Sequence, residues 1–395
     1  MRIGPLLALV SLASVHHRGE AKPAADAPEE APARSAPGRE ATPVEPASAE
    51  PPRPSPSRRA LSTAAAVVPG AVVHGSGHLV AGDPQTGYTL LAAEGVGLGL
   101  VLGGGTTFLL SGASRYLVAP AAALTILGFG LFGFSLAADI YGTASADGGA
   151  VELVPRLAPS FESELGYRYV ADPRFAYDHF VVESVTWRGG HYRVTPSAWF
   201  ATGGENARYR VEGAYRLIGV LPGERATTSD QLDIVLGALH HRYSPEHFQR
   251  SGIELALSSR YDLAHVGPSL RGAFVEFGVG YGLARIDYDL RGSDVPADGD
   301  DILLANLGFG ALLRGKAAPG SEIRFYYDHR HDDFAAGLLM TGLLSGVPGK
   351  FGLDGRWFFS PRVGVLADVH AGSAVVSGLS LVLREGIAPR PGAPR

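Results

Sequence analysis

The stretch Ile253–Leu263 reads IELALSSRYDL and decides the fold class. Its odd positions carry Ile, Leu, Leu, Ser, Tyr and Leu, whereas its even positions carry Glu, Ala, Ser, Arg and Asp. A period of two puts an apolar face and a polar face on an extended strand. The stretch therefore predicts a β-strand whose two faces meet different surroundings.

The same alternation recurs along the C-terminal part of the chain. It is seen in Phe161–Tyr169, Tyr209–Leu217, Ala273–Leu283, Ile302–Leu313 and Ile323–Tyr327. We count twelve strands, within a margin of two, centred on Leu165, Val182, Val194, Val211, Val235, Leu257, Val279, Leu307, Phe325, Leu353, Val365 and Leu381.

Strand length separates a membrane barrel from a soluble sandwich. Ordinary strands have roughly 5–6 residues, whereas membrane-barrel strands need about 9–11 to cross the apolar layer. The segment Ala273–Leu290 could pair over its whole length, with a change of phase at Ala284 and Arg285 that predicts a bulge. We therefore expect residues 151–387 to form an antiparallel transmembrane β-barrel, a mainly β fold.

The N-terminus predicts export. Arg2 precedes the apolar run Pro5–Val15, which is too short to span a bilayer, so residues 1–21 are interpreted as a signal peptide. Residues 22–60 contain ten prolines, ten alanines and twelve charged residues and predict a disordered linker. Residues 388–395 predict a disordered tail. The chain has no cysteine, and its formal charge of −5 offers no basic field for nucleic acid.

Residues 61–150 form a glycine-rich apolar segment with five charged residues. Asp83 and Pro84 predict the start of a short helix over Gln85–Leu91, followed by a helical hairpin that turns at Ser111–Ser114. One interpretation is a pair of inner-membrane helices. The favoured interpretation is a periplasmic or interfacial unit packed on the barrel, because seven glycines in residues 95–114 lower helix propensity and hydrophobicity.

Charged residues are expected to fill the lumen. The inward face presents Glu162, Glu164, Arg168, Arg208, Arg210, Glu212, Asp233, Glu254, Arg260, Glu276, Arg324, Asp328, Asp354, Arg356 and Asp368. In a barrel of this size such residues pair across the lumen, which favours a salt-bridged, structural interior over a selective channel.

A histidine-rich segment near the predicted extracellular rim is the candidate site. His329 and His331 are two residues apart and share a strand face, with Asp332 and Asp333 close enough to orient a ring or bind a metal. His240 and His241 are further candidate metal ligands. The segment loosely resembles the histidine–serine pattern on the wall of outer-membrane barrel hydrolases, but histidine stands at the serine position. The plainer interpretation is that polar residues cap the strands at the headgroup level.

A second pattern lies near the start of the apolar segment. It runs from Pro69-Gly70 through His74-Gly75-x-Gly77-His78 to Gly82-Asp83. His74 and His78 are four residues apart, as metal ligands on one helix face would be, but Gly75 and Gly77 disfavour a helix there. This stretch, with its surroundings over residues 68–97, resembles a unit of uncharacterised exported bacterial β-barrel proteins, and the resemblance implies no known activity.

These observations together predict an outer-membrane barrel of structural, adhesive or narrow-pore type, with catalysis disfavoured. Its expected partners are the lipid bilayer and lipopolysaccharide, and no cofactor or nucleic acid is expected. The alternative function is an outer-leaflet lipid-modifying hydrolase that uses His329 and His331. The alternative placement is an inner-membrane anchor with a periplasmic β domain.

Overall fold

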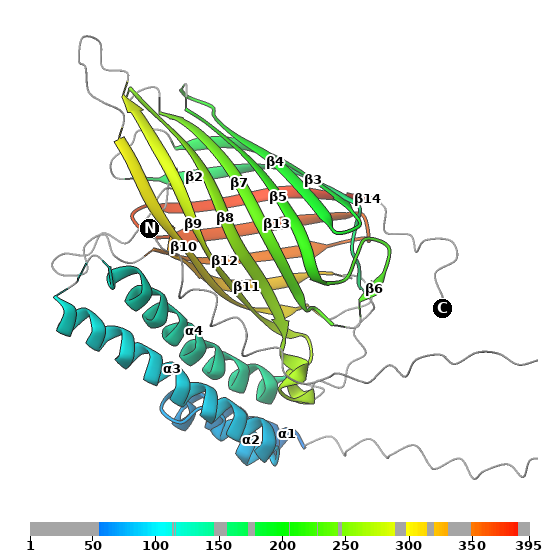
Figure 1. Cartoon of the computed structure of the whole chain (residues 1–395). Coiled ribbons are helices and arrows are strands. Elements are labelled where there is room, and N and C mark those ends of the chain that lie inside the picture. Colours follow the sequence, from blue (N-terminus) through cyan, green and yellow to red (C-terminus); the bar gives the residue numbers. More distant parts are fainter. Residues whose placement is uncertain are drawn as a thin grey trace, which may run out of the picture. The chain divides into compact units, whose positions relative to one another are not determined.

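The computed structural model (Figure 1) describes residues 55–112, 114, 116–145, 156–172, 178–204, 206–226, 228–243, 247–288, 298–313, 320–330 and 349–385. The predicted signal peptide, most of the predicted linker and the predicted tail lie outside these residues. All elements named below belong to the compact unit Pro52–Arg395.

Within the described residues, twelve antiparallel strands form a closed barrel. They are β2 (Phe161–Ala171), β3 (His179–Gly189), β4 (Tyr192–Ala201), β5 (Ala207–Gly219), β7 (Gln231–Tyr243), β8 (Phe248–Asp262), β9 (Ala273–Tyr288), β10 (Asp298–Leu312), β11 (Glu322–Asp328), β12 (Lys350–Phe358), β13 (Val363–Ala371) and β14 (Val375–Glu385). Consecutive barrel strands pair, and β14 returns to β2 with Leu381 opposite Leu165. The predicted fold class is confirmed, because each predicted strand centre lies in a different barrel strand.

The alternation in β8 separates the outer wall from the lumen. Ile253 and Leu255 are 60% and 58% exposed and point outward, whereas Glu254 between them is 6% exposed and points inward. A large apolar side chain exposed at every second position is favourable only where lipid replaces water. The outer wall of the barrel is therefore its membrane-facing surface.

Aromatic side chains gather at both ends of the outer wall. At the end that carries the β2–β3 connection, the exposed aromatics are Tyr167, Tyr169, Phe200, Tyr209, Tyr288 and Phe351. At the opposite end they are Trp187, Tyr192, Tyr215, Tyr261, Trp357 and Phe359. Two aromatic girdles that flank an apolar band are the pattern of a transmembrane β-barrel, because amphipathic rings settle at the two headgroup layers.

The expected bulge in β9 is not present. Residues Ala284 and Arg285 pair in regular register with both neighbouring strands. Arg285 points outward near the extracellular end of the strand, beyond the apolar band of the outer wall. A polar side chain fits there although the alternation of inward and outward residues continues unbroken. A register shift occurs instead in β5, between Arg216 and Ile218.

Both ends of the barrel sheet, Phe161 and Glu385, lie at the same end of the molecule. We assign this end to the periplasm, as in even-stranded outer-membrane barrels. The β8–β9 connection at this end contains two short 3-10 helices, η4 (Leu263–His265) and η5 (Pro268–Leu270). A two-stranded sheet of β1 (Arg156–Leu157) and β6 (Arg225–Ala226) is separate from the barrel.

The N-terminal elements are helical. They are α1 (Pro56–Val67), η3 (Pro69–Ala71), α2 (Ser76–Ala81), α3 (Pro84–Ser111) and α4 (Val118–Ala144). We refer to α1 through α4 as the helical unit. Two expectations were wrong here: α1 begins inside the predicted linker, and one continuous helix α3 replaces the expected short helix and first hairpin arm.

Capping residues explain where these helices begin. Ser55 precedes Pro56 and its hydroxyl accepts a hydrogen bond from the N–H of Arg58 at 3.3 Å, so the proline-rich segment can start a helix. Asp83 caps α3 in the expected way, through the N–H of Thr86 at 3.2 Å. Gly75 has a φ of 85° and caps α2, so it permits this short helix that the sequence disfavoured.

Candidate functional site

The lumen is lined by arginine–carboxylate pairs, as the alternation predicted. Pairs between adjacent strands include Arg193 with Glu212 at 2.8 Å and Arg216 with Asp233 at 2.9 Å. Such a pair keeps both side chains close to the two strands that carry them. Each charge is compensated by its partner, which offsets the cost of removing it from water.

Three of the ion pairs among the described residues join elements that lie three positions apart around the barrel. Arg330, which follows β11, binds Glu254 of β8 with both terminal nitrogens, at 2.8 Å and 2.9 Å. Arg260 of β8 binds Glu322 of β11 at 3.1 Å. Each pair joins elements three positions apart around a twelve-strand barrel, and so cuts across one side of the lumen without crossing its diameter.

The third such pair lies on the other side of the lumen. Arg356 of β12 binds Glu162 of β2 at 3.1 Å, and Arg384 of β14 binds the same carboxylate at 2.7 Å. Glu162 therefore joins three strands near the periplasmic end. We call Glu254–Arg330, Arg260–Glu322 and Glu162–Arg356 the three cross-lumen pairs.

An apolar cluster fills part of the lumen at the extracellular end. Its buried members are Val170, Phe180, Val182, Tyr243 and Val376, and Trp199, Ala201 and Phe248 pack against them. These side chains come from β2, β3, β4, β7, β8 and β14 and point inward near the ends of those strands. The cluster narrows the mouth of the barrel because its inward side chains occupy part of the lumen between these strands.

A cavity of about 500 Å³ remains in the lumen. Seven arginines and six carboxylates line it: Arg188, Arg193, Arg210, Arg260, Arg324, Arg330, Arg356, Glu212, Glu254, Glu276, Glu322, Asp328 and Asp354. Seven positive charges minus six negative charges leave one positive charge. A lining this close to neutral gives weak preference for either sign of ion.

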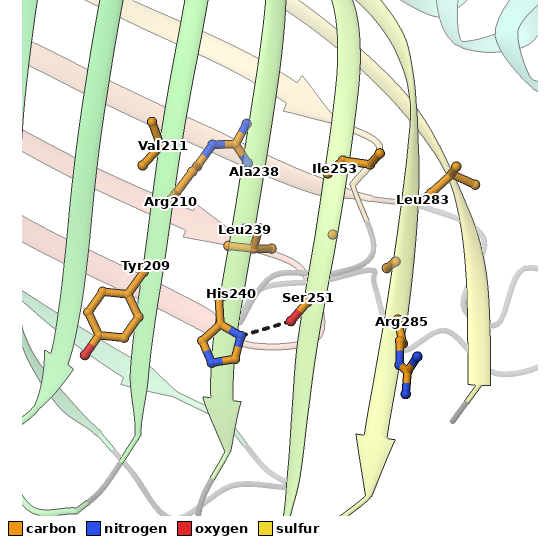
Figure 2. A pocket seen from close by; sticks show the side chains of 12 residues that line it. Tyr209, Arg210, Val211, Ala238, Leu239, His240, Ser251, Ile253, Leu283 and Arg285 are labelled. Carbon is orange, nitrogen blue, oxygen red and sulfur yellow. Dashed lines mark hydrogen bonds between the residues drawn. The ribbon is translucent and has the colours of Figure 1, made fainter. Parts of the chain in front are cut away.

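A groove of about 510 Å³ lies on the outer wall over β5, β7, β8 and β9 (Figure 2). Its floor is formed around the small residue Ala238, between Val211 and Ile253. Two residues further toward the extracellular end, His240 of β7 lies directly opposite Ser251 of β8, and His240 Nδ1 is 3.0 Å from Ser251 Oγ. The groove therefore brings a polar pair to a surface that faces lipid.

The predicted rim site is described only in part. His331, Asp332 and Asp333 lie outside the described residues. The ring of His329 pairs with the hydroxyl of Tyr327, with Nδ1 2.8 Å from the oxygen. This contact fits a residue that caps a strand, and whether His329 also binds a metal stays a prediction.

The two further metal candidates lie on opposite faces of β7. His240 faces outward beside Ser251, whereas His241 is buried in the lumen, where its Nε2 lies 2.9 Å from Asn206 Oδ1. Adjacent residues of a strand point to opposite faces, so these two rings cannot share one ion. Among the described residues no group of three or more histidine, aspartate or glutamate side chains has the geometry of a metal site.

Sequence reasoning missed a buried polar centre in the helical unit. Asp139 of α4 accepts hydrogen bonds from the backbone N–H of Gly75 at 2.9 Å and of Gly77 at 3.1 Å. It also binds the ring of His78, with Nδ1 2.6 Å from Oδ1. The other ring nitrogen of His78 lies 3.1 Å from the hydroxyl of Ser269 in η5. The Gly-x-Gly-His pattern thus holds one distant carboxylate, that of Asp139.

His74 lies in the same centre and is completely buried. Ser135 donates its hydroxyl proton to the carbonyl oxygen of Phe132, so His74 Nδ1, 2.6 Å away, donates to Ser135 Oγ. Nε2 of His74 is buried and has no hydrogen-bond partner among the described residues. Burial lowers the pKa of His74 from its ordinary value of 6.5, against the opposing effect of Glu94 and Asp139. Burial therefore favours the neutral form of the His74 ring.

The chain is similar over part of its length to several solved structures of low sequence identity. No protein-family model and no curated protein matches the chain. Omp33, an outer membrane protein of Acinetobacter baumannii, is 12% identical over 58% of this chain and 99% of its own, with a TM-score of 0.30. The KdgM porin in complex with disordered oligogalacturonate is 6% identical over 56% of this chain and 98% of its own, with a TM-score of 0.35. The translocator domain of the autotransporter NalP from Neisseria meningitidis is 13% identical over 57% of this chain and 89% of its own, with a TM-score of 0.34.

The placement of the protein follows from its own barrel. A closed barrel with an even number of strands, an apolar outer wall and two aromatic girdles is an integral protein of the bacterial outer membrane. The bilayer is accordingly its environment. The expected contact with lipopolysaccharide stays a prediction.

Proposed function

We propose that the protein is a narrow outer-membrane pore that passes water and small inorganic ions with weak selectivity. The observation that carries this proposal is the charged lumen cavity of about 500 Å³ beside the three cross-lumen pairs. These pairs narrow the lumen without crossing its diameter, so a path for small solutes remains. The nearly balanced charge of the lining supports conduction of both cations and anions.

The apolar cluster at the extracellular mouth makes the pore restrictive. Phe180 is completely buried and stacks at an angle on Trp199, with ring centroids 6.1 Å apart. Hydrated solutes larger than small ions would have to displace this cluster. The expected conductance is therefore far smaller than that of a wide, water-filled barrel.

Single-channel recording in planar lipid bilayers tests the proposal. The wild-type protein should give a small and weakly selective conductance, and Arg330→Ala should enlarge it because one cross-lumen pair is lost. Arg285→Ala is the matched control, since Arg285 sits on the outer wall and binds Asp287 at 2.8 Å. Conductance absent from both wild type and Arg330→Ala would contradict the pore and leave a purely structural barrel.

A second candidate function is hydrolysis of a lipid ester on the outer wall, favoured by the proximity of His240 and Ser251 beside the apolar groove. A serine nucleophile needs a histidine base at this distance, and usually a third group that orients the base. Within the described residues, no carboxylate binds the second ring nitrogen of His240. Labelling with a fluorophosphonate, which reacts with activated serine nucleophiles, tests this candidate. Label on the wild-type protein that is lost in Ser251→Ala would support hydrolysis. A wild-type protein that takes up no label would contradict it.

A further inference from the structure

The hairpin of α3 and α4 exposes large apolar side chains. Both helices are long and apolar enough to cross a membrane by length and composition. Leu102, Leu109 and Leu110 of α3 are 67%, 79% and 89% exposed, and Phe129 of α4 is 62% exposed. The described residues from 95 to 112 and from 116 to 138 contain no charged side chain. Such a surface is unfavourable in water, because exposed leucine and phenylalanine side chains forgo the free energy of burial.

Polar groups along the hairpin are satisfied within the protein. The hydroxyls of Thr106 and Thr107 donate to backbone carbonyls one turn earlier, at 2.7 Å and 2.8 Å. Thr125 does the same on α4, at 2.8 Å. Glu94 is buried and accepts a hydrogen bond from the N–H of His74 at 2.9 Å. These side chains thus need no hydrogen bonds from solvent, which is a condition for contact with hydrocarbon.

The two helices approach each other through glycines. A Cβ on Gly97 would lie 2.9 Å from the carbonyl oxygen of Gly128, and a Cβ on Gly104 would lie 2.7 Å from that of Ala121. Helices in membranes usually pack through small residues, which let the two backbones approach closely. The hydrophobic effect does not drive helices together there, because the lipid tails are equally apolar. We interpreted the glycines of this segment as evidence against a membrane helix. Two of them, Gly97 and Gly104, lie at the contact between α3 and α4.

One side of α4 packs on the lipid-facing wall of the barrel. Gly130 lies against Leu307 of β10, and Phe134 packs on Phe309 with ring centroids 6.4 Å apart. Leu307 belongs to the outward row of β10 but is only 5% exposed, whereas Leu236 in the outward row of β7 is 62% exposed. The hairpin thus covers part of the surface that elsewhere meets lipid, and its own exposed leucines continue that surface.

The base of the hairpin is tied to the periplasmic end of the barrel. His78 and Asp83 both lie within hydrogen-bond distance of Ser269, with separations of 3.1 Å and 3.3 Å between the polar atoms. The hydroxyl of Tyr141 donates to the carbonyl oxygen of Arg271 at 3.1 Å. From this base α3 extends over 28 residues, about 42 Å of helix. That length exceeds the roughly 30 Å of the hydrocarbon layer.

We infer that the α3–α4 hairpin is embedded in the outer membrane beside β9 and β10, with its exposed apolar face against lipid acyl chains. The barrel and the hairpin then share one continuous lipid-facing surface. The occupant of the exposed face is the bilayer itself, since the face adjoins the apolar band of the barrel and the described residues 95–112 and 116–138 carry no charge.

Site-directed spin labelling tests this inference, and the absence of native cysteine gives a clean background. A nitroxide is attached to Leu102→Cys, Leu109→Cys or Phe129→Cys in protein purified from the outer membrane and reconstituted in phospholipid vesicles. Leu236→Cys on the barrel wall is the lipid-facing reference, and Gly203→Cys in an exposed connection is the aqueous reference. Collisions with oxygen, which partitions into lipid, are compared with collisions with a water-soluble nickel chelate.

Labels on the hairpin should collide with oxygen as the label at Leu236→Cys does and lose access to the nickel chelate. Nickel access equal to that of Gly203→Cys at all three positions would overturn the inference. A thiol reagent that enters membranes should also modify Leu307→Cys more slowly than Leu236→Cys, because α4 covers Leu307. Equal rates would show that the hairpin does not lie on this wall of the barrel.

Discussion

Arg330 donates two hydrogen bonds to the carboxylate of Glu254, at 2.8 Å and 2.9 Å, although their elements lie three positions apart around the barrel. Arg210 binds the same carboxylate at 2.7 Å from the other side. Glu254 therefore balances two arginines in a largely buried part of the lumen. Loss of the shared carboxylate should affect the barrel more than loss of either arginine.

We expect Glu254→Ala to lower the free energy of unfolding by about 3 kcal/mol, because it leaves two arginines uncompensated away from bulk water. The loss of the compact, unboiled electrophoretic form along a urea series measures the effect. Arg285→Ala is the control, because an exposed ion pair contributes only about 0–1 kcal/mol. Equal effects of the two substitutions would show that the cross-lumen pairs do not stabilise the barrel.

Asp139→Ala should release the helical unit and leave the barrel intact. The substitution removes one carboxylate that accepts from three backbone N–H groups and from His78. Each buried donor left without a partner costs about 1–3 kcal/mol. Limited proteolysis should cut within α1–α4 in the variant and not in the wild type, while the barrel keeps its heat-dependent mobility. Protection equal to that of the wild type would contradict this role of Asp139.

The stability of the helical unit should fall as the pH drops below about 6.5, the ordinary pKa of histidine. Burial lowers the pKa of His74, so in this range the unfolded state binds the proton and the folded state does not. Protease resistance of α1–α4 at about pH 7.5 and about pH 5 measures the change. His74→Gln should reduce the difference between the two conditions. An unchanged difference would assign the pH dependence to other groups.

Two neighbouring glycines of α3 should respond to alanine with opposite signs. A Cβ on Gly104 would press on the backbone of α4, so Gly104→Ala should destabilise the hairpin. A Cβ on Gly103 meets nothing within 4 Å, and Gly103→Ala should stabilise the helix by about 0.5–1 kcal/mol. Thermal unfolding of the helical signal measures both variants. Destabilisation by both, to the same extent, would contradict the close helix contact.

The sequence predicted the barrel well because alternation reports the face of each residue directly. Ile253 and Glu254 were assigned to the lipid and lumen sides from their positions alone, and the structure agrees. Alternation does not report which residues meet across the lumen, so the partnership of Glu254 with Arg330 could not be predicted.

The helical unit was harder to predict because its contacts join residues far apart in the chain. The spacing of His74 and His78 suggested metal ligands, but the partner of His78 is Asp139, 61 residues later. The role of a glycine such as Gly104 likewise depends on a second helix that the local pattern does not identify. Composition alone therefore could not show which glycines of α3 make the close contact with α4.

The central claim is that the chain folds as a closed barrel in the outer membrane, and the electrophoretic mobility of protein from isolated outer membranes tests it most directly. The folded barrel should resist detergent, so the unboiled sample should migrate faster than the boiled one. Recovery of the protein in the inner membrane, with the same mobility before and after boiling, would contradict the account and support a helical anchor with a periplasmic β domain.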